Sequence, residues 1–146
     1  MSPPIPHQPT SVSTEFVADP DLALEIEKRS KPCAQIHDGV LFRQGQLPTA
    51  LYLIKSGEVA LAMESENRMV MCVRAGSGSL VGLPAVVGDK PYSMTAAPCD
   101  GADIREISSS DFKDLISGNP NLAMKVLQVL AAEVHLARRH CLELLF

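Results

Sequence analysis

Between Lys31 and Ile107 the chain is built of short apolar segments separated by glycines, and this pattern constrains the fold more than any other feature. The segments are rich in Val, Ile, Leu, Met and Tyr. The separating glycines stand at positions 39, 45, 57, 76, 78, 82, 88 and 101. Short, evenly spaced strands with turn residues between them are typical of an antiparallel sandwich or barrel.

The apolar segments predict eight strands, which suits a small roll of two antiparallel sheets. Ser56-Gly57 lies between two apolar runs, as a tight turn would. The polar stretch 64–67 is expected to form the tip of a hairpin. The predicted strands lie near residues 32–36, 40–43, 50–55, 58–64, 68–74, 79–81, 92–98 and 102–107.

The part of the chain before the strands divides into a tail and a short helix. Residues 1–14 contain four prolines and five Ser or Thr residues, a composition that cannot bury a core. We therefore expect a flexible tail over residues 1–19. Asp19 can cap a helix with Pro20 in its first turn, so a short helix is predicted over Asp21–Ser30.

After the last predicted strand the apolar spacing changes to that of a helix. Ser109 or Ser110 can cap a helix that ends at Gly118. A second helix, capped by Asn119, is predicted to begin at Pro120, which suits the first position of a helix, and no breaker follows. The predicted fold class is therefore mainly β with flanking helices: an antiparallel, jelly-roll-like β-roll over residues 20–119 and a long dimerisation helix over residues 120–146.

The long helix carries two apolar stripes. One holds Leu122, Val126, Val129 and Leu136. The other is spaced 4, 3, 4, 3, 4 and 3 residues, an unbroken seam with the period of a coiled coil. We expect one stripe to cover the roll and the other to pair with a second chain, because two stripes exceed what one sheet face would cover. This second stripe, called the dimer seam below, consists of Ala123, Leu127, Leu130, Val134, Ala137, Cys141 and Leu144.

Composition excludes several function classes. Thirteen basic and seventeen acidic residues give a net charge of −4, which argues against binding of nucleic acid or a membrane surface by charge alone. No run approaches the roughly 18 apolar residues of a membrane span, and the N-terminus carries no secretory signal. The four cysteines have no metal-ligand spacing and are interpreted as buried free thiols. We expect a cytoplasmic protein.

Several segments together resemble a known family. Residues 39–45 read Gly-Val-Leu-Phe-Arg-Gln-Gly, and residues 51–59 read Leu-Tyr-Leu-Ile-Lys-Ser-Gly-Glu-Val. Followed by Gly82, Pro91 and the stretch 93–95, they resemble the cyclic-nucleotide-binding domain of the Crp/Fnr regulators. The resemblance implies a β-roll with flanking helices, and a homodimer with the long helix as its axis. In those regulators DNA is read by a helix-turn-helix domain, which is not present in this chain.

The phosphate-binding cassette of that family is altered here at both of its charged positions. The family's cassette begins Gly-Glu and ends Pro-Arg-(Ser/Ala)-Ala-Thr, whereas this chain has Leu83 for the Glu and Tyr92 for the Arg. Without the guanidinium fork a bound phosphate loses its strongest contact, so ordinary cAMP binding is not expected. The candidate ligand pocket consists of Gly82, Leu83, Pro84, Ala85, Tyr92, Ser93, Met94 and Thr95.

These observations favour a sensor and dimerisation module of a Crp/Fnr-type transcriptional regulator, with a small-molecule effector that is more apolar than a nucleotide. Two alternatives stay open. One is a structural dimerisation module whose pocket is filled by Leu83, Tyr92 and Met94, and the other is a cyclic-nucleotide receptor with altered contacts. The sequence holds no His-x-His pair and no nucleophile elbow, and His135 and His140 diverge on the helix. We therefore predict no enzymatic activity, no metal site and no cofactor.

Overall fold

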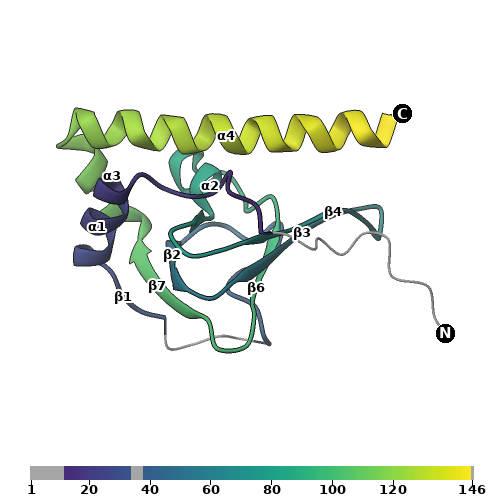
Figure 1. Ribbon diagram of the computed structural model, residues 1–146, viewed down its shortest axis with the longest axis horizontal. Coiled ribbons are helices and arrows are strands. Elements are labelled where there is room, and N and C mark those ends of the chain that lie inside the picture. Colours follow the sequence, from purple (N-terminus) through teal and green to yellow (C-terminus); the bar gives the residue numbers. More distant parts are fainter. Residues whose placement is uncertain (1–11, 34–37, 146) are drawn as a thin grey trace.

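Seven strands form two antiparallel sheets in the computed structural model, which describes residues 12–33 and 38–145 (Figure 1). The first sheet has the order β1 (Lys31–Pro32), β7 (Asp103–Ser108), β2 (Ala50–Ser56) and β5 (Leu80–Val81). The second has the order β4 (Arg68–Ala75), β3 (Val59–Ser65) and β6 (Thr95–Pro98). The predicted double-sheet roll is confirmed.

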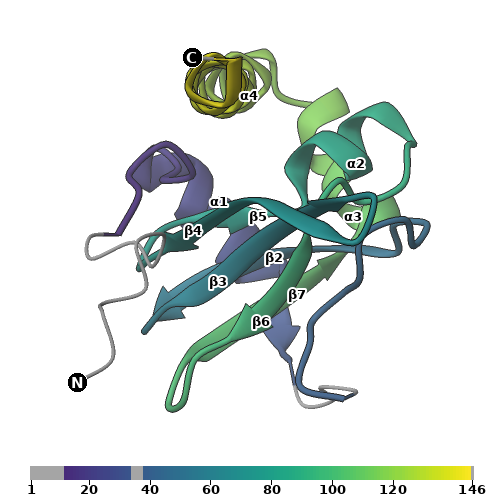
Figure 2. The same cartoon turned by 90° about the vertical axis from the view of Figure 1, so that its right-hand side faces the viewer.

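Within the described ranges, four helices flank the sheets. Helices α1 (Pro20–Arg29) and α3 (Ser109–Ser117) contact β2 and β7 of the first sheet. Helix α2 (Leu83–Gly88) follows β5, and α4 (Pro120–Leu145) runs across the top of the molecule (Figure 1). Figure 2, which views α4 end-on, shows this helix lying above the strands rather than beside them. Among the residues described here, no helix combines the length and the apolar character needed to cross a membrane.

Strand β2 is buried on both of its faces, and this divides the core into two layers. Ala50, Tyr52 and Ile54 belong to the apolar interior of the roll. Leu51 and Leu53, on the opposite face, belong to a second cluster that fills the space under the helices. Because neighbouring side chains of a strand point to opposite faces, one strand supplies both layers. We call these two clusters the roll core and the helical core.

The start of α1 is held by a capping carboxylate, as the sequence predicted. The Asp19 side chain accepts a hydrogen bond from the Asp21 N–H at 2.9 Å. The ammonium of Lys125, on α4, donates to Asp19 at 2.9 Å and to Asp21 at 3.1 Å. This ammonium lowers the pKa of the Asp19 carboxyl. One carboxylate therefore both caps α1 and joins it to α4.

Three strand predictions are wrong in extent. The segment 40–43 pairs with β6 only at an isolated bridge between Phe42 and Ala96. The strand predicted over 92–98 begins at Thr95, because the Tyr92 backbone bonds to a turn at residues 45–46 instead of to a strand. The strand predicted over 32–36 ends at Pro32, and residues 34–37 lie outside the described part.

Two helix predictions also need correction. The cap of α3 is Ser108, whose hydroxyl accepts from the Asp111 N–H at 3.1 Å, and neither Ser109 nor Ser110 takes this role. Helix α2 was not predicted, because six residues are too few to show a helical period. By contrast, the cap of α4 is the predicted Asn119, whose amide oxygen accepts from the Leu122 N–H at 3.2 Å.

The segment before α1 is packed where a flexible tail had been expected over residues 1–19. Residues 1–11 lie outside the described part. In the rest of this segment Phe16 is only 2% exposed and joins the roll core. Ser13 forms a bridge with Ala75, and Val17 forms one with Ser79. The apolar side chain of Phe16 thus overrides the polar composition of its neighbours.

The two-layered burial of β2 generates a stability prediction. We expect Leu51→Ala to lower the free energy of unfolding by about 2–5 kcal/mol, because Leu51 has no exposed surface and its loss leaves a cavity in the helical core. Leu47→Ala is the matched control, since Leu47 is 69% exposed and should cost less than about 0.5 kcal/mol. Urea unfolding measures both, and equal losses would contradict this account of β2.

Candidate ligand pocket and dimer seam

The cassette segment turns at Gly82, directly after β5. Gly82 has a φ of +92°, in the region that favours glycine, and it precedes the first turn of α2. A Cβ atom built on Gly82 would lie 2.9 Å from Cε1 of Tyr92. Both the backbone conformation and the close approach of this ring therefore require glycine at position 82.

Tyr92 stands at the cassette position where the family resemblance expected a phosphate-binding arginine. Its ring stacks on Phe42 with a centroid distance of 3.8 Å and an interplanar angle of 15°. Its hydroxyl donates to the carbonyl of Ala50 at 2.6 Å, and its backbone N–H donates to the carbonyl of Gln46 at 2.9 Å. Burial raises the pKa of this phenol. The ring is therefore fixed at both ends, with its polar atom satisfied.

The predicted pocket residues do not all face one cavity. Six of them line a small hollow inside the roll: Gly82, Pro84, Ala85, Tyr92, Ser93 and Met94. Leu83 is fully buried in the helical core, so the expectation that it lines or fills the pocket is wrong. Thr95 is not among the lining residues, and its hydroxyl instead accepts from the Gln44 N–H at 3.0 Å. The orientation of Leu83 follows from the turn into α2, which sequence spacing alone does not specify.

The hollow is too small for a nucleotide. Its volume is about 20 Å³, room for about one water molecule. Pockets that enclose ligands of nucleotide size measure roughly 300–1,000 Å³. The rings of Phe42 and Tyr92, stacked on each other, are among the side chains that line this hollow.

A second cleft, of about 140 Å³, lies between α4 and the roll. Its lining is apolar apart from Ser93 and Glu133. Glu133 was not predicted as a site residue, although its position on α4 carries a signal. Glu133 stands four residues after Val129 and three before Leu136, so it continues the apolar stripe that packs on the roll. An acidic residue at such a position is the feature that could have revealed this cleft.

Glu133 is an acid in apolar surroundings. Its Oε1 atom is buried and finds no hydrogen-bond partner among the described residues. Burial raises the pKa of its carboxyl to about 8. Tyr92, which lines the neighbouring hollow together with Glu133, is the other titratable side chain among the residues described around the two cavities. At neutral pH the carboxyl is therefore mostly protonated and can donate as well as accept a hydrogen bond.

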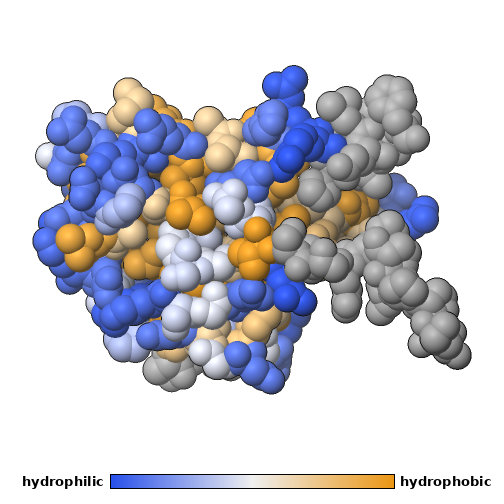
Figure 3. Space-filling model, viewed as in Figure 1, coloured by the Kyte–Doolittle hydropathy of each residue, from blue (hydrophilic) through white to orange (hydrophobic). Residues whose placement is uncertain are grey.

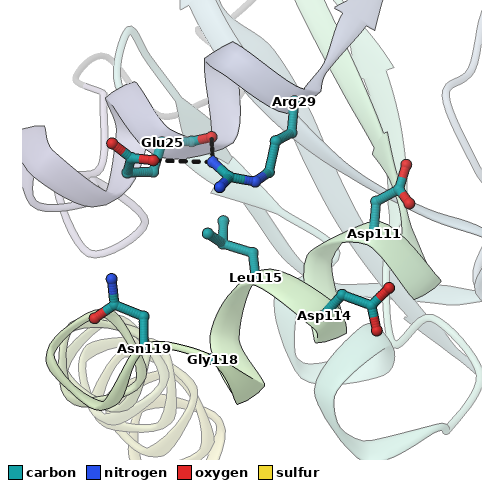
Figure 4. Close-up of a pocket in the computed structure, with 7 residues that line it drawn as sticks. All are labelled: Glu25, Arg29, Asp111, Asp114, Leu115, Gly118 and Asn119. Carbon is teal, nitrogen blue, oxygen red and sulfur yellow. Dashed lines mark hydrogen bonds and ion pairs between the residues drawn. The ribbon is translucent and has the colours of Figure 1, made fainter.

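A wider groove of about 610 Å³ opens between α1 and α3, away from the cassette (Figure 4). Three carboxylates line it: Glu25, Asp111 and Asp114. Arg29 does not point to a free anion site there, because its guanidinium is paired with Glu25 at 2.9 Å. The groove is open and acidic, as expected of a solvated surface, and it adds no ligand site to this description.

The cysteines and histidines supply no metal centre in the described part of the chain, where no cluster of three or more His, Cys, Asp or Glu residues has the needed geometry. Cys72 and Cys99 are free thiols but only half-buried, and Cys33 is also half-buried, so full burial was a wrong expectation for these three. His135 is exposed. The side chains of His140 and Cys141 lie outside the described part.

The two stripes of α4 differ in burial. Leu122, Val126, Val129 and Leu136 are buried against the domain, as one stripe was expected to be. In the dimer seam, Leu127 and Val134 are 56% and 59% exposed, while Ala123, Leu130 and Ala137 are half-buried. The side chains of Cys141 and Leu144 lie outside the described part. Figure 3 shows hydrophobic patches among hydrophilic side chains along the upper edge of the molecule, where α4 runs.

Comparison with known proteins identifies the family to which this fold belongs. The family model described as the cyclic nucleotide-binding domain matches residues 37–119, more than half of the chain. The chain therefore belongs to the cyclic nucleotide-binding domain family.

The relatives are longer proteins. A protein named as a potassium channel in Rhodopseudomonas palustris is 30% identical over 97 residues, which cover 66% of this chain and 23% of that protein. The catabolite activator protein of Thermus thermophilus superposes with a TM-score of 0.69 at 24% identity, covering 87% of this chain and 60% of that one. The c-di-GMP responsive regulator CLP of Xanthomonas campestris gives a TM-score of 0.60 at 19% identity, covering 85% and 60%. These two structures share the fold with this chain.

The buried acid generates a prediction for stability against pH. The pKa of the Glu133 carboxyl is about 8 in the folded chain, against an ordinary value of 4.5 for a glutamate in water. The folded state therefore binds this proton more tightly than the unfolded state, and its contribution to stability is lost as pH rises from about 4.5 to 8. We expect Glu133→Gln to be more stable than the native chain at pH 8.5, with the advantage shrinking toward pH 5.

Thermal unfolding between pH 5 and 8.5 measures this difference. Glu66→Gln removes a charge from the exposed hairpin tip and is the matched control, which should follow the native curve. Acids whose pKa is lowered, such as Glu15 and Asp19, act equally in both proteins and cancel from the comparison. A Glu133→Gln curve that runs parallel to the native one over this range would show that the Glu133 pKa is unshifted.

Proposed function

We propose that this chain is the sensor and dimerisation module of a Crp/Fnr-type transcriptional regulator, and that its effector is not an ordinary cyclic nucleotide. The observation that carries the proposal is the difference in burial between the two apolar stripes of α4. One stripe packs on the roll that holds the cassette, and the other leaves Leu127 and Val134 exposed. An event in the roll can therefore reach a partner chain through one rigid helix.

The exposed stripe supports a homodimer. Large apolar side chains repeated at coiled-coil spacing are costly to leave in water and pack well against the same stripe of a second chain. The small side chains of Ala123 and Ala137 would allow the two helix axes to approach closely. Two parallel copies of α4 would then form the dimer axis, with one roll on each side.

The state of the cassette supports a change of effector. The Tyr92 ring fills the phosphate position and leaves a hollow of about 20 Å³. The charged anchors of the family are absent, because Leu83 and Tyr92 stand in their places. A phosphate placed there would meet apolar rings and lose the fork of donors that it needs. A regulator with this cassette would respond to a different small molecule, or to none.

The filled hollow also favours one alternative, a structural dimerisation module without an effector. In that case α4 would join two chains and the roll would act as a rigid support. The other alternative, a cyclic-nucleotide receptor with altered contacts, requires Tyr92 to leave its stack with Phe42. The structural module would not respond to a cyclic nucleotide, whereas the altered receptor would. Both alternatives predict the same dimer.

Three further expectations concern DNA binding, cellular location and catalysis. In a Crp/Fnr-type regulator DNA is read by a helix-turn-helix domain, and the net charge of −4 gives this chain no electrostatic attraction for DNA. We expect this module to supply effector response and pairing, in the cytoplasm, with no catalysis of its own.

The seam predicts a specific dissociation by mutation. The double variant Leu127→Glu and Val134→Glu should be a monomer where the native chain is a dimer, because it places like charges opposite each other in a desolvated seam. Both side chains are more than half exposed in the single chain, so the fold itself should persist. Sedimentation velocity at micromolar concentration measures the change, and circular dichroism checks the fold.

The matched control adds the same charges to another face of the same helix. Gln128 and His135 are both exposed, and each follows a seam residue by one position, so Gln128→Glu with His135→Glu should leave the dimer intact. A native chain that sediments as a monomer at micromolar concentration would overturn the proposed dimer. The same conclusion would follow if the seam variant and the control sedimented alike.

A further inference from the structure

The cleft between α4 and the roll has the size of a small ligand. Its volume of about 140 Å³ is close to the roughly 150 Å³ of an apolar cavity that is known to hold benzene. The lining residues include three thioether side chains, Met63, Met71 and Met94, together with Phe16. Thioethers are flexible and polarisable, so they can adjust to the shape of a compact hydrocarbon.

One polar group stands out in this apolar lining. The Oε1 atom of Glu133 is buried and unpartnered among the described residues, and Glu133 lines both the cleft and the neighbouring hollow. A buried acceptor without a donor costs stability, and a ligand that brings the donor can recover this cost. The hydroxyl of Ser93 is the other polar side chain at the cleft. A ligand that fits must therefore combine an apolar body with a single donating head group.

We propose that this cleft binds a small primary amine with a compact hydrocarbon body, whose ammonium group pairs with the Glu133 carboxylate as this carboxyl releases its proton to solvent. This assignment deepens the proposed sensor function and rests on it. An ammonium supplies three donors to the unpartnered carboxylate, and a charge-assisted hydrogen bond of this kind is about twice as strong as a neutral one. Benzene-sized hydrocarbon matches the space beneath α4, and a nucleotide exceeds it.

The position of the cleft connects the ligand to the dimer. Val134 and Ala137 line it from α4, and both belong to the dimer seam. Leu136, on the buried stripe, lines it as well and is part of the roll core. A molecule in the cleft therefore touches both faces of α4 and can shift the helix against the roll, which is the motion that a sensor of this type requires.

Calorimetric titration of the native chain with benzylamine tests the proposal directly. We expect a dissociation constant below about 1 mM, since eight non-hydrogen atoms can supply that affinity. Benzyl alcohol, which keeps the hydrocarbon and loses the charge, should bind at least tenfold more weakly. Benzoate carries the opposite charge and should not bind. The variant Glu133→Gln should lose at least tenfold in affinity for benzylamine, and Glu66→Gln should match the native chain.

Each contrary result overturns the assignment. Absence of benzylamine binding at millimolar concentration, or equal binding by Glu133→Gln, would show that the carboxyl does not hold an amine. Benzoate binding would show instead that the protonated acid recognises a carboxylate. If benzyl alcohol bound as tightly as benzylamine, the cleft would recognise only the hydrocarbon body and not the ammonium group. Sedimentation of the same samples separates this failure from failure of the proposed function, because the seam dimer does not depend on the amine.

Discussion

The burial of β2 on both faces is the constraint on which the rest of the molecule depends. A strand with one face in water would need only one apolar layer. Here Tyr52 and Ile54 hold the roll core together, while Leu51 and Leu53 hold the helices against the sheet. Helices α1 and α3 contact β2, and the first part of α4 joins them in this second layer, so the placement of α4 over the roll depends on β2 through these two helices.

The proposed loss of the cassette's charges is compatible with a stable fold, because Tyr92 makes its contacts inside the protein. Its ring stacks on Phe42 and its hydroxyl donates to the Ala50 carbonyl. These contacts involve only protein groups, so they stabilise the roll without a ligand. Under the proposed function, the cassette gives up recognition of a phosphate and gains a filled interior.

The packing of the interior is interrupted at the cleft between α4 and the roll. Glu133 carries a carboxyl into it without a partner among the described residues, although the rest of the stripe on that side of α4 is apolar. Such a group costs stability, and the cost is recovered only when a donor arrives. Under the proposed function, the response to a ligand therefore involves α4 and the roll together and not the cassette loop.

Much of the fold could be predicted from the sequence because it depends on local periodicity. The glycine-separated segments predicted the roll, Asp19 and Asn119 predicted two helix caps, and the spacing on α4 predicted which residues pack on the domain. Tertiary placement could not be predicted in the same way. The inward packing of Phe16, the turn that sends Leu83 into the helical core and the partnerless state of Glu133 depend on neighbours that are distant in the sequence.

The central claim is that the cassette is closed to cyclic nucleotides by the Tyr92 ring. Calorimetric titration of the native chain with cAMP and with cGMP, each up to millimolar concentration, tests it most directly. We expect no saturable heat with either nucleotide, because the hollow beside Tyr92 measures about 20 Å³ and its described lining holds no cationic group to replace the family's arginine. A dissociation constant in the micromolar range for either nucleotide would contradict the account, since it would require Tyr92 to leave its stack with Phe42.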